Sequence, residues 1–431
     1  MRAIERRSGR TIMAVLTMSR VTFGVLTALV VLVASGGLTS RTPAAAQSPG
    51  PIKIGFIYPD KGPLAQLGID LRDGFLLYWG EVGNKAGGRP VELILETKAS
   101  SKPDEGLTKA RKLVEHDKVH LLGGVIASPV AYALRPYVIA QKTPLVVMNA
   151  GADGLTQRQR SPYIFRTSFS NSDSSHPLGE WAYKQGYRKM VLMGADFVAA
   201  YEHMGGIART FTEAGGQVIQ EIYPPFGNAD FAPFLSQIRR DADVVATFFA
   251  GVDAIRFVKQ YEEYGLKGKI PLIGKGLTQG DVLSKIGEPA VGIVSAIHWV
   301  PAVDTPENKR FMEAYAAKYK RPAVDMAEQG YVGAQAIARA LEAVKGNVED
   351  QAAFLAALKA VEFNGPRGRV RFDAFQNVVH TVHILKVEQR GGAVENLPMA
   401  SFPNTTQFWK WSPEAFMALT PYAELRGKWA K

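Results

Sequence analysis

The chain offers few side chains that could form a catalytic or metal-binding set. Its 431 residues include seven histidines and no cysteine, which excludes disulfides, thiolate metal sites and a cysteine nucleophile. His116 and His120 are four residues apart where a predicted helix gives way to a strand, so solvent exposure is favoured over metal binding. His380 and His383 lie three apart on a predicted strand, where their side chains point to opposite faces. Neither pair suits a metal.

The loop motifs of common enzymes are also missing. No Gly-x-Gly-x-x-Gly follows the first predicted strand, and the sequence has neither a phosphate-binding P-loop nor a Gly-x-Ser-x-Gly turn. Glu262 and Glu263 are adjacent on an amphipathic helix and indicate a solvated face. His298 is the one histidine that could border a ligand, although packing is the favoured interpretation. We therefore predict no enzymatic activity, no cofactor and no metal.

Strand and helix patterns alternate over about 250 residues, and these elements must position any binding residues. The predicted strands fall into two series, at 52–58, 91–95, 119–124 and 144–148, and then at 190–193, 217–223, 243–249, 271–273 and 291–297. Alternation of this kind builds parallel sheets with helices on both faces. The two series predict an α/β fold with two doubly wound lobes.

The remaining chain is predicted to be helical over 306–361, followed by short strands at 369–372 and 379–387 and a tail that contains proline and tryptophan. In an open α/β sheet, ligands bind beyond the carboxyl ends of the strands. With two lobes, those ends can face each other across a cleft.

The first forty-six residues have the pattern of an export signal. Basic residues precede an apolar run at 21–33, and Ala44, Ala45 and Ala46 supply the small residues that signal peptidase requires. Met18 is an alternative start, since a complete signal follows it. The formal net charge of +11 includes this Arg-rich leader, and the rest is spread without a basic run. We predict a cleaved signal peptide over 1–46, a periplasmic location and no nucleic-acid partner.

Short motifs recur in a fixed order after the leader. They lie at 52–55, 62–65, 86–93, 110–114, 123–125, 162–168, 230–231, 320–322, 363–368 and 370–373. Each is weak alone, but in this order over about 330 residues the chain resembles the type I periplasmic solute-binding proteins. The similar class comprises the receptors for branched-chain amino acids, amides and aromatic acids that serve ABC importers.

This resemblance implies two lobes joined by three hinge crossings. The first lobe would hold residues 50–168 and 300–363, and the second would hold 169–299 and 364–431. The protein would be a monomer, and a small-molecule ligand between its lobes would favour the closed form by hinge bending. This closed form would dock on an ABC permease at the membrane.

Two loops of the first lobe are the expected ligand contacts. Ser128 and Pro129 follow the third strand, and Asn149, Ala150 and Gly151 follow the fourth. In the family, these loops hold a carboxylate or amide with hydroxyls and with free N–H groups at helix starts, which favour an anion. Ser128 is the strongest candidate, and a simple helix N-cap is an equally open interpretation of it.

The second lobe contributes an aromatic-bearing loop in this family, which here contains Phe197 and Tyr201. Tyr201 matches a recurring tyrosine, with a core role as the alternative. Gly251 lies in a loop of small residues that would let the backbone approach a ligand. Trp299 could stack on a planar ligand, but packing between the lobes is favoured, and packing is also favoured for Tyr58 at the end of the first strand.

One departure from the family bears on specificity. Gly276 occupies the position where branched-chain amino-acid receptors carry an acid for the ligand's ammonium group. A buried ammonium without an anion would cost several kcal/mol, so an α-amino acid is disfavoured unless Asp281, Asp196 or Asp253 reaches the site. The tail at 408–416 resembles receptors for aromatic acids. We predict capture of a small, aromatic carboxylic acid, with branched-chain amino acids, amides, urea or a role as a ligand-sensing partner as alternatives.

Overall fold

Two sheets, the first mainly parallel and the second mixed, organise the residues that the computed structural model describes, which are 50–96 and 101–430. The predicted signal peptide lies outside the described residues. The mixed α/β class predicted from the alternating pattern is confirmed.

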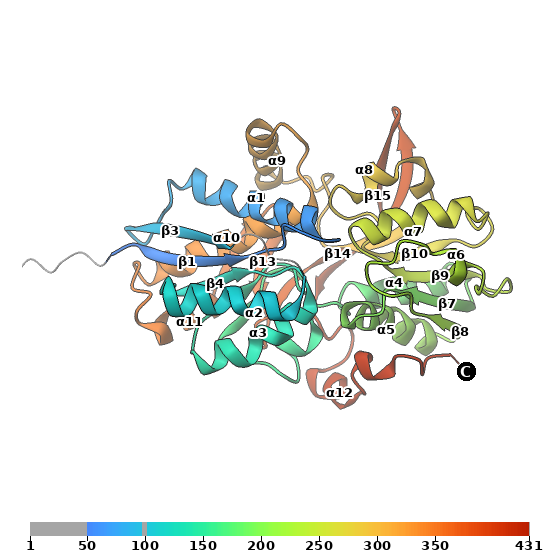
Figure 1. Cartoon of the computed structure of the whole chain (residues 1–431), viewed down its shortest axis with the longest axis horizontal. Helices are drawn as coiled ribbons and strands as arrows, with labels where there is room; N and C mark the ends of the chain where they lie inside the picture. Colours follow the sequence, from blue (N-terminus) through green and yellow to red (C-terminus); the bar gives the residue numbers. More distant parts are fainter. Residues whose placement is uncertain (1–49, 97–100, 431) are drawn as a thin grey trace, which may run out of the picture. The chain divides into compact units, whose positions relative to one another are not determined.

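The first sheet has six strands in the order β2-β3-β1-β4-β5-β6. Its strands are β1 (Ile52–Ile57), β2 (Lys85–Ala86), β3 (Arg89–Glu96), β4 (Leu121–Gly124), β5 (Leu145–Val147) and β6 (Ile164–Arg166). Only β2 pairs antiparallel, with β3. The strands are nearly continuous apolar runs because helices cover both faces. Figure 1 shows α1 and α10 on one face, and α2 and α3 on the other.

The second sheet has eight strands in the order β12-β13-β14-β11-β10-β9-β7-β8, and a ninth, β15, pairs with β14. Their bounds are β7 (Lys189–Gly194), β8 (Gln217–Ile222), β9 (Val244–Phe248), β10 (Leu272–Lys275), β11 (Val294–Ile297), β12 (Glu362–Gly365), β13 (Gly368–Phe372), β14 (Val378–Arg390) and β15 (Ala393–Thr405). Along β7, Val191 and Met193 pack with α7 and α8, whereas Met190 and Leu192 pack with α4 and α5. Neighbouring residues thus serve opposite faces, as the period of a strand requires.

Helices fill the connections between the strands. The α-helices are α1 (Ala65–Glu81), α2 (Pro103–Arg111), α3 (Ser128–Ala140), α4 (Ser175–Lys184), α5 (Val198–Glu213), α6 (Ala232–Leu235), α7 (Val252–Glu263), α8 (Val282–Ile286), α9 (Pro306–Tyr319), α10 (Asp325–Ala343), α11 (Gln351–Lys359) and α12 (Pro413–Ala418). Shorter helical turns are η1 (Lys112–His116), η2 (Asp153–Thr156), η3 (Glu288–Ala290) and η4 (Tyr422–Leu425).

The helices α9 to α11 carry the chain back from the second sheet toward the first. Val332, Ile337 and Leu341 of α10 join the apolar core of the first sheet. Helix α10 packs backbone to backbone against α1, because a Cβ on Gly330 would lie 1.9 Å from the Leu71 carbonyl oxygen. The chain therefore passes between the sheets after β6, after β11 and after α11.

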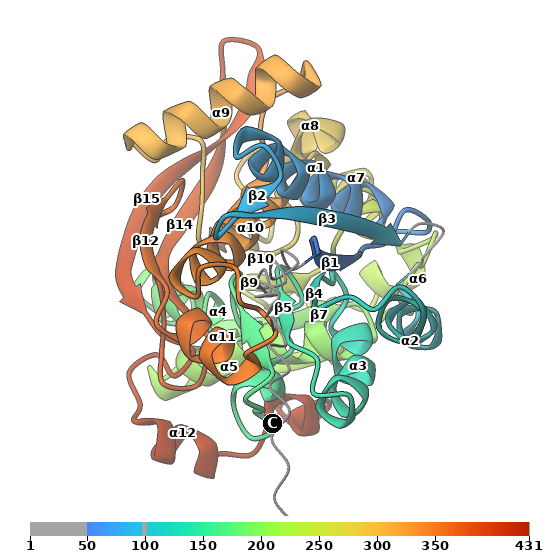
Figure 2. The same ribbon diagram turned by 90° about the vertical axis from the view of Figure 1, so that its left-hand side faces the viewer.

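A long hairpin at the edge of the second sheet differs from the sequence-based expectation. The short strand predicted at 379–387 is part of β14, which pairs antiparallel with β15, and both strands have 13 residues. Figure 2 shows the two strands side by side. Pro398 and Pro403 are unsuited to the interior of a sheet, but an edge strand tolerates proline because its outer N–H groups need no partner.

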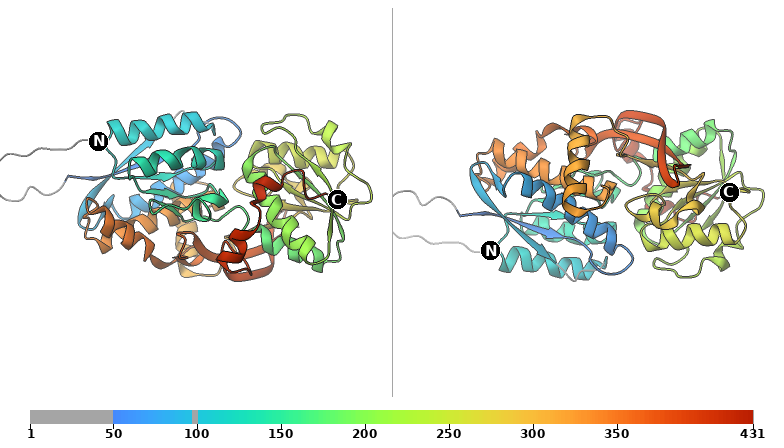
Figure 3. Two further views of the ribbon diagram at one scale, coloured as in Figure 1. Left: turned by 90° about the horizontal axis from the view of Figure 1, so that it is seen from below. Right: turned by 90° about the horizontal axis from the view of Figure 1, so that it is seen from above.

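The C-terminal segment lies against α5, as the dark red ribbon in Figure 3 shows. A Cβ on Gly205 would lie 2.5 Å from the Cβ of Tyr422, so this glycine allows η4 to approach the helix closely. Glu221 accepts hydrogen bonds from the N–H groups of Gly427, Trp429 and Ala430, which fastens the end of the segment. Within the described residues, no helix is both long and apolar enough to cross a membrane.

Candidate functional site

Loops from both sheets meet around one cavity at the carboxyl ends of the strands. The space open to the centre of a water molecule is about 40 Å³, several times the roughly 10–15 Å³ that one water needs. We call the residues around it the cavity lining. They are Leu64, Leu67, Ile126, Ala127, Ser128, Asn149, Gly151, Phe169, Asn171, Phe197, Ala199, His203, Phe248, Ala250, Gln279 and Met326. Four predicted ligand contacts are brought together here, namely Ser128, Asn149, Gly151 and Phe197.

The start of α3 supplies hydrogen-bond donors on the side of the first sheet. Ser128 is buried, and its Oγ accepts a hydrogen bond from Asn171 Nδ2 at 3.2 Å, which leaves its hydroxyl proton available to a ligand. Pro129 lies in the first turn of α3, where a residue without an N–H is tolerated. Because the free N–H groups of a helix start favour an anion, this part of the cavity suits a carboxylate.

The loop after β5 closes the same side. Asn149 Nδ2 donates to Gln329 Oε1 at 2.7 Å, which orients the Asn149 side chain. Gly151 has no room for a side chain, since a Cβ there would lie 2.1 Å from Asn171 Oδ1. Ala150 is buried outside the lining, and its N–H donates to a carbonyl just after β4. Ala150 thus supports the loop from behind.

Aromatic rings form the wall on the side of the second sheet. His203 stacks on Phe248 with the ring centroids 4.2 Å apart and an interplanar angle of 21°. Phe197 lies 5.8 Å from the same phenylalanine. Burial, aided by nearby Lys275, holds the pKa of His203 well below its usual range, so the imidazole is neutral. This wall suits a flat apolar ring.

Phe169, in the segment after β6, separates the cavity from a buried lysine. Lys275 Nζ lies 3.4 Å from the centroid of the Phe169 ring and donates to Ser174 Oγ at 2.6 Å. Burial lowers the pKa of Lys275 to about 7, although Asp173 acts in the opposite direction. A ligand would contact the ring with this amine behind it.

Gln279, in the loop after β10, has an unused hydrogen-bond donor. Its Nε2 is buried and has no hydrogen-bond partner among the described residues. An unpaired buried amide costs about 1–3 kcal/mol, a penalty that an acceptor on a ligand would remove. Gly276 lies outside the lining, and its φ of +84° lets the loop pass close to the Phe249 carbonyl.

Among the described residues, no carboxylate belongs to the cavity lining. Asp281 pairs with Lys285 at 2.5 Å, and Asp196 pairs with Arg426 at 2.6 Å. Asp253 accepts the N–H of a loop glycine at 2.7 Å. All three acids that the sequence offered as partners for an ammonium group are thus engaged elsewhere.

Tyr201 and Trp299 also lie outside the lining. The Tyr201 hydroxyl donates to Asp196, and the Arg426 guanidinium lies 5.3 Å from the centroid of its ring. The Trp299 indole N–H donates to Asn308 Oδ1 at 2.8 Å, which ties it to α9. A ligand contact by either residue stays a prediction.

Tyr58 and Gly251 have other neighbours as well. Tyr58 is buried beside a separate small cavity, with its ring 5.8 Å from that of Phe56. Gly251 has a φ of +58°, and a Cβ there would lie 2.3 Å from the Pro63 carbonyl oxygen. The close backbone approach at Gly251 is therefore made to the loop after β1.

Sequence reasoning missed the segment directly after β6. Polar residues dominate 167–175, yet they are all almost fully buried. Phe169 and Asn171 of this segment belong to the cavity lining, as do His203, Phe248 and Gln279 on the second side. A run of serine, asparagine and aspartate resembles an exposed loop. The available signal was its place at the end of the recurring motif at 162–168.

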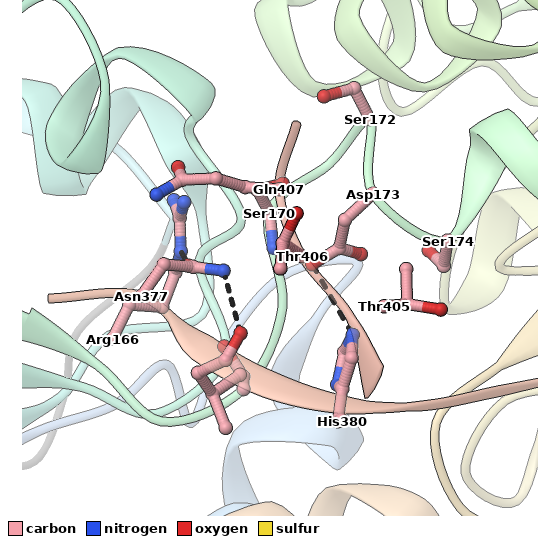
Figure 4. Close-up of polar contacts among 12 residues, drawn as sticks. Arg166, Ser170, Ser172, Asp173, Ser174, Asn377, His380, Thr405, Thr406 and Gln407 are labelled. Atoms are coloured by element: carbon pink, nitrogen blue, oxygen red, sulfur yellow. Dashed lines mark hydrogen bonds and ion pairs between the residues drawn. The ribbon is translucent and has the colours of Figure 1, made fainter. Parts of the chain in front are cut away.

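Charged and titratable side chains lie behind the cavity lining, and we call this second set the crossing network. Its buried members are Arg166, Asp173, Lys275, His298, Glu328, Arg367 and His380. Figure 4 shows part of the set, with Asp173 and His380 forming an ion pair at 3.3 Å. Burial acts to raise the pKa of Asp173, but His380 and Lys275 outweigh it, so the pKa lies below its usual value. Arg166 Nε donates to Asn377 Oδ1 at 2.7 Å in the same view.

Arg367, which follows β12, forms hydrogen bonds to α10 and to the segment after β6, next to the passages between the sheets. Its Nε and Nη2 donate to the two oxygens of Glu328 on α10 at 2.7 and 2.5 Å. Its Nη1 donates to the carbonyls of Thr167 and Ser168 at 3.0 and 3.1 Å. Both partners are fully buried, so removal of one would leave an unpaired charge in the interior.

His298 packs between the network and the lining. Its ring stacks on His380 with centroids 5.4 Å apart and lies 5.6 Å from Phe169. Its ring nitrogens lack hydrogen-bond partners among the described residues, and burial holds the pKa of His298 well below its usual range. In the described part of the chain, no group of three or more His, Cys, Asp or Glu side chains is placed to hold a metal ion.

Comparison with known proteins matches this architecture. The family model described as periplasmic binding protein matches residues 51–393. A Leu/Ile/Val-binding protein homolog from Brucella melitensis is 32% identical over 328 residues, which cover 75% of this chain and 83% of that protein.

Solved structures give the same result. An ABC transporter substrate-binding protein from Sphaerobacter thermophilus is 39% identical with a TM-score of 0.78, over 83% of this chain and 99% of that one. A solute-binding protein from R. palustris in complex with benzoate is 32% identical with a TM-score of 0.77, over 81% and 96%. A third, from Rhodopseudomonas palustris HaA2 with p-hydroxybenzoic acid, is 31% identical with a TM-score of 0.78, over 83% and 98%. The chain therefore belongs to the periplasmic binding protein family, whose members are the substrate-binding receptors of transporters, and it has the type I fold.

Proposed function

We propose that this protein captures an aromatic carboxylic acid for an ABC importer and releases it chemically unchanged. The ligand would lie in the cavity between two lobes, 50–168 with 300–363 and 169–299 with 364–431. Hinge bending at the three passages between the sheets would open and close the lobes. The closed form would be a monomer that docks on a membrane permease in the periplasm, after removal of residues 1–46.

The composition of the cavity lining carries this proposal. It combines three phenylalanines and a neutral histidine with the start of α3, and none of its described members is a carboxylate. A flat ring fits against the phenylalanines, and a carboxylate fits at Ser128. An ammonium group would be desolvated there without an anionic partner, at a cost of several kcal/mol.

The similar structures support the same ligand class. Those that hold benzoate and p-hydroxybenzoic acid are 32% and 31% identical to this chain. The name of the Brucella relative favours branched-chain amino acids as the alternative. An amino-acid ligand would need an acidic side chain from outside the cavity lining to pair with its ammonium group. Binding measurements with aromatic acids and with amino acids therefore distinguish the two ligand classes.

A thermal-shift panel of benzoate, 4-hydroxybenzoate, leucine, valine and urea tests the proposal. A ligand present at 100 times its Kd stabilises the folded state by about 2.7 kcal/mol, which raises Tm by several degrees. We expect the aromatic acids to raise Tm and the amino acids and urea to leave it unchanged. A rise with leucine or valine alone would favour the alternative receptor.

A further inference from the structure

Glu202 of α5 connects the two sides of the cavity from just outside its lining. Its carboxylate is buried and accepts a hydrogen bond from the Tyr132 hydroxyl of α3 at 2.8 Å. It also accepts the N–H of Asp153 in η2 at 3.1 Å and Asn171 Nδ2 at 2.6 Å. Helix α5 packs on the second sheet, whereas α3 and η2 belong with the first. Glu202 therefore fastens the two sides of the cavity together.

The same side chain positions two members of the cavity lining. Asn171 Nδ2 donates to Ser128 Oγ at 3.2 Å as well as to Glu202. One amide thus bridges the Glu202 carboxylate and the hydroxyl that we propose for the ligand's carboxylate. Any change at Glu202 reaches the ligand through a single intervening residue.

Two buried carboxylates are adjacent at this point without a cation between them. Neither Glu202 nor Asp153 forms an ion pair with another described residue. Burial and the nearby Asp153 raise the pKa of Glu202 to about 8. Burial raises the pKa of Asp153 to about 6 although Arg166 opposes the change. Both acids also border a larger cavity of about 440 Å³, through which protons can reach them while both side chains stay buried.

Several other charged or titratable groups face this pair. They are Tyr132 on α3, Arg166 on β6, Asp173 after β6, His203 on α5, Lys275 at the end of β10, and Arg135, Arg158, Tyr422 and Glu424 around the larger cavity. The arginines at 135 and 158 donate to backbone carbonyls. None of these cations pairs with Glu202, so its proton is the means by which its charge is neutralised.

We propose that Glu202 is a positioning residue that takes up one proton when the lobes close on a ligand. The inference rests on the proposed hinge closure but not on the identity of the ligand. In the protonated acid, one oxygen still accepts from Asp153 and Asn171, and the other bears the proton and still accepts from the Tyr132 hydroxyl through its remaining lone pair. The neutral form keeps every contact across the cavity.

The direction of the pH effect follows from the two environments of this acid. When α5 separates from α3, water reaches Glu202 and its pKa falls toward the ordinary value of 4.5. Between about pH 4.5 and 8, the closed form then holds more protons than the open form. The closed fraction and the ligand affinity are therefore highest at the acid end of this window. They fall as the pH rises and level off above about pH 8.

A spin-label experiment tests this without knowledge of the ligand. The chain has no cysteine, so Thr108→Cys on α2 and Lys259→Cys on α7 place one exposed label on each side. Distance distributions of the ligand-free protein should show a larger closed fraction at pH 6 than at pH 8.5. Glu202→Gln mimics the protonated acid, so its closed fraction should be high and equal at both pH values.

Two further variants and a ligand titration complete the test. Glu213→Gln changes a more exposed acid on the same helix and should follow the unmodified protein. Tyr132→Phe should lower the closed fraction at both pH values and keep the pH dependence. With benzoate as the probe, Kd of the unmodified protein should rise about tenfold from pH 6.5 to 8, and that of Glu202→Gln less than twofold.

The outcomes separate this inference from the proposed function. Parallel pH profiles for Glu202→Gln and the unmodified protein, including two flat ones, would overturn the role of Glu202. Failure of benzoate to bind, together with a pH-dependent closed fraction that Glu202→Gln abolishes, would reject the ligand class and support the role of Glu202.

Discussion

The cavity lining and the crossing network are neighbours with opposite chemistry. The lining is aromatic and neutral, with its polar groups limited to a hydroxyl, three amides and an uncharged imidazole. The network behind it is buried as deeply but consists of arginines, carboxylates, histidines and one lysine. The Phe169 ring separates the two, since it lines the cavity and also contacts Lys275 Nζ at 3.4 Å.

This separation suggests a division of roles. Within the network, Arg367 pairs with Glu328, and His380 lies 3.3 Å from Asp173. These charges are matched among themselves, so they need not set the charge of the ligand site. The ligand then meets rings and a helix start. If the division holds, changes in the network should alter stability, and changes in the lining should alter affinity.

The largest effect is expected in the network. Arg367→Met removes one partner of a fully buried ion pair and leaves Glu328 unpaired. We expect the free energy of unfolding, measured by urea denaturation, to fall by about 3–5 kcal/mol. Arg369→Met, two residues away, breaks an exposed pair with Glu362 and should cost at most about 1 kcal/mol. Equal losses for the two variants would contradict a structural role for the buried pair.

The next largest effect is expected in the aromatic wall. Phe197→Ala removes a half-buried ring from the lining and should weaken benzoate binding about 10- to 100-fold, the size of a lost aromatic contact with its buried area. Unfolding free energy should change little in comparison. Tyr201→Phe, one turn along α5 and outside the lining, should leave Kd within about twofold. Titration calorimetry measures both, and a larger loss for Tyr201→Phe would place the ligand elsewhere.

Ser128→Ala tests the polar end of the cavity. A hydrogen bond to a charged group contributes about 1.5–3 kcal/mol, so benzoate should bind at least about tenfold more weakly. The neutral analogue benzamide should lose less, because its oxygen carries no full charge. The structure makes Ala127 the N-cap of α3 and gives Ser128 no capping hydrogen bond. If Ser128 served only the packing of this segment, both probes would bind unchanged and Tm would fall instead.

Lys275→Met tests whether charge from the network reaches the ligand through the Phe169 ring, and the expected effect is the smallest. Burial lowers the pKa of Lys275 to about 7, so the amine is charged mainly below that pH. The variant should bind benzoate about two- to fivefold more weakly at pH 6 and equally well at pH 8.5. A loss of equal size at both pH values would point to packing rather than charge.

The fold could be predicted from the sequence because its signals are local. The apolar run at 52–57 indicates a buried strand, and the helical spacing over 306–361 indicates the stretch that forms α9, α10 and α11, in both cases without reference to distant residues. The strand β15 was not predicted, because its prolines Pro398 and Pro403 are tolerated in a strand only at the edge of a sheet. That β15 lies at such an edge is shown only by its pairing with β14.

The site could be predicted only in part. Ser128, Asn149, Gly151 and Phe197 lie beyond strand ends, and that position is visible in the sequence. Asn171 and Glu202 depend on hydrogen bonds between residues up to 70 positions apart, which no local pattern reveals. The burial of the polar segment at 167–175 likewise depends on the crossing network around it.

Calorimetric titration of the protein with 4-hydroxybenzoate and with leucine tests the central claim most directly. A neutral, aromatic lining predicts saturable binding of the aromatic acid at least about 100-fold tighter than any binding of leucine, a difference of about 2.7 kcal/mol. Tighter binding of leucine would contradict the claim, because it would require an anionic partner that the cavity lining does not contain.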